Sequence, residues 1–191
     1  MADETGRPLR ADAQRNRDRI LSAAVRVFAE EGLEAHMERI AKEAGVGSGT
    51  LYRNFPTREV LIEAAYRNEL IRLCDAAPGL LAELPPREAL RAWTGRFIDY
   101  ATAKLGMADA LRALVETGVN PYARSHEMMM AALTSLLAAG VEAGTIRSDI
   151  GAADMFAALT GIALTSGRPE QREQAERLLD LTLDGLSTDR R

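Results

Sequence analysis

The sequence has little of what catalytic and metal sites are built from, with one cysteine and two histidines among 191 residues. Cys74 has no second cysteine with which to form an intrachain disulfide or a thiolate metal cluster. His36 and His126 lie far apart, and neither belongs to a His-Glu-x-x-His or Glu-x-x-His motif. We therefore expect no metal, no cofactor and no enzymatic activity.

Long hydrophobic runs are also lacking. No stretch approaches the roughly 20 apolar residues that cross a bilayer, and residues 1–7 lack the apolar core of a signal peptide. We expect a cytoplasmic protein with no membrane partner.

The net charge of −4 is unevenly distributed: residues 1–58 carry ten Lys or Arg against nine Asp or Glu, and residues 59–191 carry fourteen against nineteen. The acidic excess is thus mostly remote from the N-terminal region, and a nucleic-acid partner for that region stays open.

Apolar residues recur at helical spacing over most of the chain, and no segment has the sustained alternation of a strand. The pattern predicts an all-α fold. Caps and breakers predict several boundaries: Thr57 begins a helix that Pro78-Gly79 ends, Asn120-Pro121 opens another that continues to Gly144, and Asp149 caps the next. An early glycine and proline are expected to leave residues 1–14 unstructured.

Residues 37–55 form two short helical patterns separated by a glycine. Met37, Ile40, Ala41 and Ala44 fall at i, i+3, i+4 and i+7, so they line one face of a helix. Gly45 stands where a left-handed residue is needed to end that helix.

In the second pattern, Leu51 and Phe55 both face inward because they are four residues apart. Gly47 and Gly49 leave the start of this helix nearly bare, so its backbone can approach a duplex closely. An ordinary helical hairpin is the alternative for this segment alone. The outward polar residues include no carboxylate and can donate to phosphates or base edges of DNA; they are Ser48, Thr50, Tyr52, Arg53 and Asn54.

Several short motifs surround this hairpin. They are Phe28 with Gly32, Ile40-Ala41, Ala44-Gly45-Val46, Thr50-Leu-Tyr-Arg-Asn-Phe55 and Pro56-Thr-Arg-Glu59. Together they cover about residues 15–66 and resemble the DNA-binding domain of the TetR family of transcriptional regulators. Ala35-His36 departs from the family pattern, which usually has Thr, Ser or Pro there. The resemblance implies an N-terminal three-helix helix-turn-helix DNA-binding domain, followed by a larger helical ligand-binding and dimerisation domain.

The expected organisation has four parts. They are a flexible basic arm (1–14), the helix-turn-helix domain (15–58), a connecting helix (59–77) and an effector-binding and dimerisation domain (78–191). Arg15, one of several arginines in the first 26 residues, is also expected to contact DNA. The arm can lie along the DNA backbone or in a minor groove, or it can be a solvated tail.

Roles within the DNA-binding domain are hypotheses. Thr50, Tyr52 and Arg58 are expected to bind phosphates, since two lie on the exposed helix and Arg58 lies in the first turn of the next. Ser48, Arg53 and Asn54 are then nearest to base edges, and Gly49 allows close approach.

Aromatic and methionine side chains of the distal domain suggest a pocket for a small apolar or amphipathic effector. Simple core packing is the alternative for each of them. The candidates are Trp93, Phe97, Tyr100, Met107, Leu111, Tyr122, Met129 and Phe156.

The last two helices carry more apolar surface than one core contact requires. We expect them to pair with their two-fold copies in a four-helix interface, as the resemblance also implies. A monomer with a thick core is the alternative. The residues predicted for this interface are Met155, Leu159, Ile162, Leu178, Leu179, Leu183 and Leu186.

The resemblance implies a repressor that binds double-stranded operator DNA as a homodimer. Its two recognition helices must lie about 34 Å apart, one duplex turn, and a ligand that tilts the connecting helix would release the operator. Activation by a ligand, or the absence of one, stays open. Two other classes also stay open: a helical protein-interaction module and a small-molecule-binding bundle that does not bind DNA.

Overall fold

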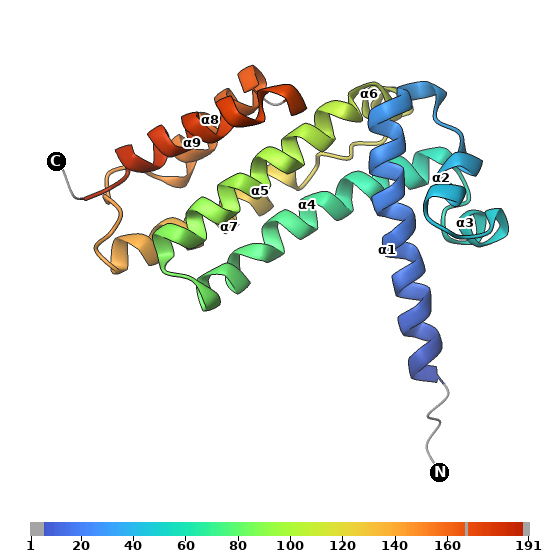
Figure 1. Ribbon diagram of the computed structural model, residues 1–191, viewed down its shortest axis with the longest axis horizontal. Coiled ribbons are helices and arrows are strands. Elements are labelled where there is room, and N and C mark those ends of the chain that lie inside the picture. Colours follow the sequence, from blue (N-terminus) through green and yellow to red (C-terminus); the bar gives the residue numbers. More distant parts are fainter. Residues whose placement is uncertain (1–5, 167, 189–191) are drawn as a thin grey trace, which may run out of the picture. The chain divides into compact units, whose positions relative to one another are not determined.

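The computed structural model describes residues 6–166 and 168–188, and the regular structure in these ranges is helical (Figure 1). An isolated antiparallel bridge joins Ile146 to Ser187. The expected all-α fold is confirmed. In the described ranges, no helix is both long and apolar enough to cross a membrane. The elements, with two short 3₁₀ helices written η, are α1 (Gly6–Glu31), η1 (Gly32–Glu34), α2 (Met37–Glu43), α3 (Ser48–Asn54), α4 (Arg58–Glu83), α5 (Pro86–Gly106), α6 (Ala108–Glu116), α7 (Ser125–Glu142), α8 (Ala152–Ser166), η2 (Pro169–Gln171) and α9 (Arg172–Gly185).

The chain divides into two compact units. The first unit holds the residues up to Asn68 together with Gly106–Pro121, and the second holds Glu69–Leu105 together with the residues from Tyr122 on. The expected division at residue 78 did not foresee that α6 belongs to the first unit. There α6 packs on η1, and a Cβ added at Gly106 would lie 2.6 Å from the Ala29 side chain. Only glycine allows this approach.

The apolar faces of α1, α2 and α3 form the core of the first unit. Ile20 and Phe28 of α1, Ile40 of α2, and Leu51 and Phe55 at α3 are all fully buried. Helix α1 packs on α2, and α2 packs on α3. The turn between α2 and α3 uses a glycine in the left-handed region, with φ of 64° at position 45. The predicted hairpin and its glycine turn are confirmed.

Helix α1 begins earlier than expected. It starts at Gly6, so the prediction of an unstructured arm is wrong for residues 6–14, while residues 1–5 of that arm lie outside the described residues. Pro8 lies in the first turn, where its missing N–H has no intrahelical partner and its fixed φ suits a helix. The proline is therefore compatible with a helix start.

Helix α4 also continues beyond its expected end. It passes through Pro78 and Gly79 to Glu83, although a proline inside a helix removes one backbone hydrogen bond. Ala77 and Leu80, on either side of Pro78 and Gly79, are buried. Their burial offsets the lost hydrogen bond and keeps the last turns helical.

Two boundaries of later helices differ as well. Helix α7 begins at Ser125, because residues 121–124 form turns where the sequence predicted the first helical turn. Helix α8 begins at Ala152 rather than directly after Asp149, and both carboxylate oxygens of Asp149 accept hydrogen bonds from Arg147 at 2.6 Å.

Trp93 is the central core residue of the second unit. Its ring is fully buried, and its Nε1 donates a hydrogen bond to the Leu73 carbonyl of α4 at 2.9 Å. Helices α8 and α9 lie side by side (Figure 1), and α7 packs on α8. Three surface ion pairs connect α5 with α9, namely Arg91–Asp180, Arg87–Asp184 and Asp99–Arg172. Exposed pairs of this kind each contribute little to stability.

We expect the Cys74 thiol to react slowly. Burial, with a smaller contribution from Asp75, raises the pKa of Cys74 to about 11. Because the thiolate is the nucleophile, labelling of the folded protein with a disulfide reagent at pH 8 should be at least about 100-fold slower than labelling of the urea-unfolded chain. The labelling rate should rise as the pH approaches 11. Folded and unfolded rates within tenfold of each other at pH 8 would contradict this prediction.

Candidate functional site

Helix α3 is held in place by the two side chains on its inner face. Leu51 and Phe55 are both 0% exposed. The Arg17 guanidinium of α1 lies over the Phe55 ring, 4.5 Å from its centroid, and adds a cation–π contact. The opposite face of α3 is consequently turned to solvent.

That outer face carries the residues predicted to contact DNA. The Arg53 side chain bends back along the helix, where Nε donates to the Gly49 carbonyl at 3.1 Å and Nη2 donates to Thr50 Oγ1 at 3.3 Å. The Asn54 amide donates to the Thr50 carbonyl at 2.8 Å. The structure therefore brings the predicted residues of α3 together on one face. Of these, Ser48, Gly49, Tyr52 and Arg53 are exposed, and Thr50 and Asn54 are half-buried.

Gly47 and Gly49 have no internal packing role. A Cβ added at either position would meet no atom within 4 Å, and neither residue has a positive φ. Gly49 is the second residue of α3, and glycine is up to about 1 kcal/mol less favourable than alanine in a helix. The folded chain itself thus gives no reason for a bare backbone here, whereas a close external partner would.

Tyr52 forms a hydrogen bond with Glu38, a residue that the sequence analysis did not predict to belong to this site. Its hydroxyl donates to Glu38 Oε1 at 3.1 Å, across the contact between α2 and α3. This hydrogen bond is the main cause that raises the pKa of Tyr52 above its ordinary value. Glu38 lies in the first turn of α2. The only signal in the sequence was its position two residues before Ile40-Ala41, which does not by itself indicate a partner on the next helix.

Arg58, which the sequence analysis expected to bind a phosphate, makes its contacts within the first unit. Its guanidinium donates to the Ala35 carbonyl, and also to the Gly32 carbonyl at 3.0 Å. It lies 5.0 Å from the centroid of the Phe28 ring. These contacts join the first turn of α4 to the segment between α1 and α2, so we assign Arg58 a structural role.

Arg15, also predicted to contact DNA, lies on α1. Its side chain is 67% exposed and pairs with Asp12 one turn earlier. Such an exposed pair is weak, and a phosphate can compete for the guanidinium.

His36 precedes α2 without capping it through the side chain. In the part of the chain that the structure describes, no group of three or more His, Cys, Asp or Glu side chains could hold a metal ion.

Phe97 is at the centre of an aromatic cluster in the second unit. Its ring centroid is 6.1 Å from that of Trp93, 6.2 Å from that of Tyr100 and 6.3 Å from that of Phe156. The His126 ring lies 5.1 Å from Phe156. The structure therefore brings together four of the eight residues predicted for an effector pocket.

The other four predicted pocket residues are divided between the units. Met129, which is buried, and Tyr122, which is half-buried, lie in the second unit with the aromatic cluster. The Lys104 ammonium lies 4.8 Å from the centroid of the Tyr122 ring. Met107 and Leu111 are buried in the first unit. In this unit, α6 packs on η1.

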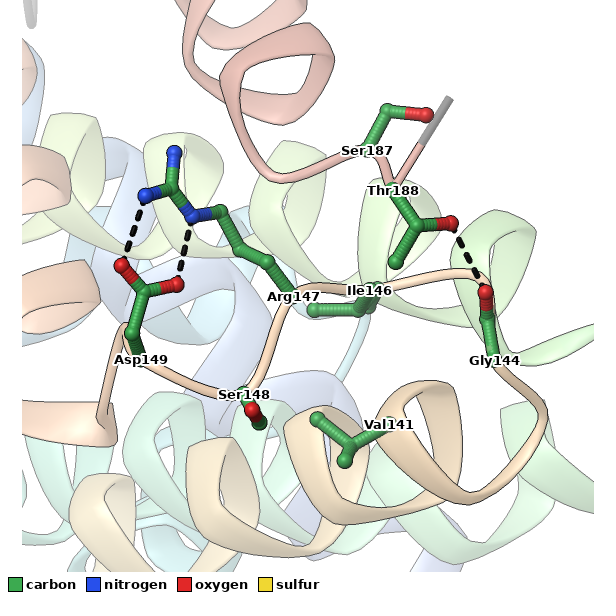
Figure 2. Close-up of a pocket in the computed structure, with 8 residues that line it drawn as sticks. All are labelled: Val141, Gly144, Ile146, Arg147, Ser148, Asp149, Ser187 and Thr188. Carbon is green, nitrogen blue, oxygen red and sulfur yellow. Dashed lines mark hydrogen bonds and ion pairs between the residues drawn. The ribbon is translucent and has the colours of Figure 1, made fainter. Parts of the chain in front are cut away.

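A surface depression of about 590 Å³ lies elsewhere in the second unit (Figure 2). It is formed by the end of α7, the segment that follows, and residues 187 and 188. The Arg147 side chain beside it is already bonded to the Asp149 carboxylate, and Thr188 donates to the Gly144 carbonyl (Figure 2). None of the predicted pocket residues lines this depression, and its polar groups are largely engaged with one another.

The residues predicted for the dimer interface lie on α8 and α9 or directly after α9, and most of them are buried within their own chain. Leu178 is half-buried, while the other six are at most 8% exposed because they pack inside their own chain. The six are Met155, Leu159, Ile162, Leu179, Leu183 and Leu186. The outward apolar residues on α8 and α9 are instead Leu164, 83% exposed, and Leu181, 71% exposed.

Two family models match the chain. Residues 20–65 match the model of bacterial regulatory proteins of the tetR family, and residues 85–188 match the C-terminal domain of SbtR-like transcriptional regulators. The second match alone covers more than half of the chain. The chain belongs to the TetR family.

Solved structures support the TetR-family assignment over the whole fold. The TetR transcriptional regulator SCO0520 from Streptomyces coelicolor is 75% identical, with a TM-score of 0.87, over 90% of this chain and 98% of that chain. The TetR regulatory protein from Mycobacterium vanbaalenii is 38% identical, with a TM-score of 0.77, over 95% of this chain and 100% of that chain. The protein is accordingly a DNA-binding transcriptional regulator, and its family is not one of enzymes.

Curated relatives match a shorter part of the chain. The HTH-type transcriptional regulator SAUSA300_2515 of Staphylococcus aureus (strain USA300) is 46% identical over 63 residues, which is 32% of this chain. The chain spans about a third, 34%, of the length of that relative. This likeness is therefore confined to about a third of this chain.

Replacing Arg58 by alanine is expected to lower the free energy of unfolding by about 1–3 kcal/mol, because the Gly32 and Ala35 carbonyls lose a charged donor. Urea denaturation followed by circular dichroism measures this change. The dependence of DNA affinity on salt should stay the same, since no phosphate contact is lost.

Arg53→Ala is the matched control. It removes an exposed arginine and should change stability by no more than about 0.5 kcal/mol, while altering DNA binding. A normally stable Arg58→Ala variant whose salt slope fell by about one would restore the phosphate role of Arg58.

Proposed function

We propose that this TetR-family protein is a homodimeric repressor that binds a specific operator through the outer face of α3. In the proposal it acts in the cytoplasm and leaves the operator when a small apolar or amphipathic molecule binds the second unit. The observation that carries the proposal is the bare, carboxylate-free outer face of α3, with Gly47 and Gly49 open to solvent.

On this face, the proposed roles follow from side-chain chemistry. Ser48, Arg53 and Asn54 read base edges in the major groove, since hydroxyl, guanidinium and amide groups match the donors and acceptors there. Thr50 and Tyr52 bind phosphates, with Arg15 as a further phosphate ligand from α1. The open backbone at Gly49 lets the helix sit deep in the groove.

A homodimer is supported by the outward faces of α8 and α9. Leu164 and Leu181 are too exposed to be part of their own core. Ala157 and Gly161 lie seven and three residues before Leu164 and are also exposed, so the backbone of a second copy can approach closely. Two-fold pairing of these helices forms the proposed four-helix interface.

The aromatic cluster around Phe97 is the proposed effector site. It offers apolar surface, and Lys104 and His126 add cationic or polar groups beside Tyr122 and Phe156. This combination favours an amphipathic effector. An effector weakens DNA binding only as far as it prefers one state of the dimer. A change from the spacing of about 34 Å between the two recognition helices is sufficient, because successive major grooves then no longer fit.

Selection from a randomised pool of duplex DNA tests this proposal. We expect enrichment of an inverted repeat with half-sites one duplex turn apart, because a two-fold dimer reads the same sequence twice. If no sequence is enriched even at low salt, operator binding through α3 is wrong, and α3 would have to contact another kind of partner.

Gly49→Ala should have opposite effects on folding and on DNA binding. The added methyl group should raise the free energy of unfolding by roughly 0.5–1 kcal/mol, because alanine is a better helix former and nothing inside the protein obstructs it. It should weaken binding to the selected duplex in fluorescence anisotropy, because the helix can no longer approach as closely.

Gly79→Ala is the matched control for Gly49→Ala. Gly79 is also exposed inside a helix and has no atom within 4 Å of an added Cβ. It should stabilise the protein similarly and leave DNA affinity unchanged. Equal DNA affinities for the two variants would contradict the close-approach role of Gly49.

Leu181→Glu should convert the dimer to a monomer at micromolar concentration. The substitution puts a charge on each copy of an apolar interface that has no partner for it. Sedimentation velocity measures the change. Leu105→Glu, at a 50% exposed leucine of α5, is the control and should stay dimeric. A Leu181→Glu variant that sediments as a dimer would exclude this face as the interface.

A further inference from the structure

The hydrogen bond between Tyr52 and Glu38 joins two elements of the proposed DNA-binding face. The Tyr52 hydroxyl of α3 donates to Glu38 Oε1 of α2 at 3.1 Å. Tyr52 is 41% exposed and Glu38 is also exposed. The bond is therefore at the surface, where a DNA phosphate can reach the same hydroxyl.

Glu38 differs from three other acidic residues of this region. Glu30 and Glu31 both pair with Arg39, and Glu43 pairs with Arg26. Among the described residues, Glu38 forms no ion pair, and the hydrogen bond from Tyr52 is the contact that its carboxylate makes. Its position in the first turn of α2 favours a negative charge there. A negative charge not neutralised by a basic side chain thus lies beside a proposed phosphate ligand.

The Tyr52 hydroxyl cannot donate its proton to Glu38 and to a DNA phosphate at the same time. A phenol has one O–H to donate, so the same proton bonds either the Glu38 carboxylate or a phosphate oxygen. Binding of a phosphate by Tyr52 must break the bond to Glu38. The released carboxylate then repels the phosphate, since two like charges several ångströms apart interact unfavourably even in water.

We propose that Glu38 is a positioning residue of the DNA-binding face, which holds the Tyr52 hydroxyl in the free protein and must give it up to a phosphate on DNA. The inference rests on the proposed function and adds a residue that limits the affinity of the DNA-binding face for DNA. Glu38 weakens DNA binding through Tyr52, so its removal releases a preformed phosphate donor.

A double-mutant cycle on the selected duplex tests the exchange. Glu38→Ala should raise affinity about three- to tenfold in fluorescence anisotropy at fixed salt. In the Tyr52→Phe background, the same substitution should raise affinity at most about twofold, because the hydroxyl to be released is absent. Glu38→Gln retains an acceptor for Tyr52 without the charge, so its effect should lie between those of wild type and Glu38→Ala.

A second measurement follows the hydrogen bond itself in the absence of DNA. The phenol titration of Tyr52 is obtained from ultraviolet absorbance as the difference between each protein and its Tyr52→Phe counterpart. The bond to Glu38 raises the pKa of Tyr52, so Glu38→Ala should lower it towards its ordinary value. Unchanged circular dichroism and an unchanged urea midpoint establish that each variant is folded.

Glu34→Ala is the matched control, because it removes an exposed acidic side chain of η1. Its effect on DNA binding should be small and equal in both backgrounds. Equal effects of Glu38→Ala with and without the Tyr52 hydroxyl would overturn the proposal, since Glu38 would then act by charge alone. Reduced affinity of Glu38→Ala would also overturn it, because Glu38 would then favour DNA binding rather than weaken it. Failure of the wild-type protein to bind any selected duplex would instead remove the proposed function itself.

Discussion

The burial of Leu51 and Phe55 is the constraint on which the DNA-binding face depends. Helix α3 has only seven residues, which is too short for a helix to be stable alone in water. Its structure is therefore supplied by the core of the first unit, in which both side chains are fully enclosed. Rotation of α3 about its axis would expose one of them, at a cost of roughly 2–3 kcal/mol. The same two contacts thus stabilise the helix and fix which of its side chains face outward.

The local part of this arrangement could be predicted from the sequence. The helical spacing of Leu51 and Phe55 and the position of Gly45 involve residues within a turn or two of one another, so the pattern contains the whole signal. The contacts of Arg58 and Glu38 could not be predicted in this way. The Ala35 carbonyl is 23 residues from Arg58, and Tyr52 is 14 residues from Glu38. A sequence pattern identifies a cation or a carboxylate at such positions but not the partner that tertiary packing brings to it.

The face of α9 that is buried in its own chain could not be identified from the sequence for a related reason. This helix has leucines on both sides, and helical periodicity identifies two apolar faces without indicating which is inside. Packing on α8 decides the matter, since Leu179 and Leu183 are buried whereas Leu181 is exposed. The prolines follow the same rule. Pro8 is tolerated by its place in a first turn, and Pro78 by its buried neighbours. Whether a leucine is buried or a proline is tolerated in a helix depends on tertiary contacts that the sequence pattern does not reveal.

The first unit is assembled from two separate stretches of the chain, because α6 packs on η1 and Gly106 lies against Ala29. A DNA-binding unit built in this way is not a module that one continuous stretch of the chain encodes. Recombination that joined the first 68 residues of one regulator to the remainder of another would bring together an η1 and an α6 that had never been selected to fit. New effector specificities in this lineage should therefore arise more readily by substitutions within the second unit than by wholesale exchange of C-terminal modules.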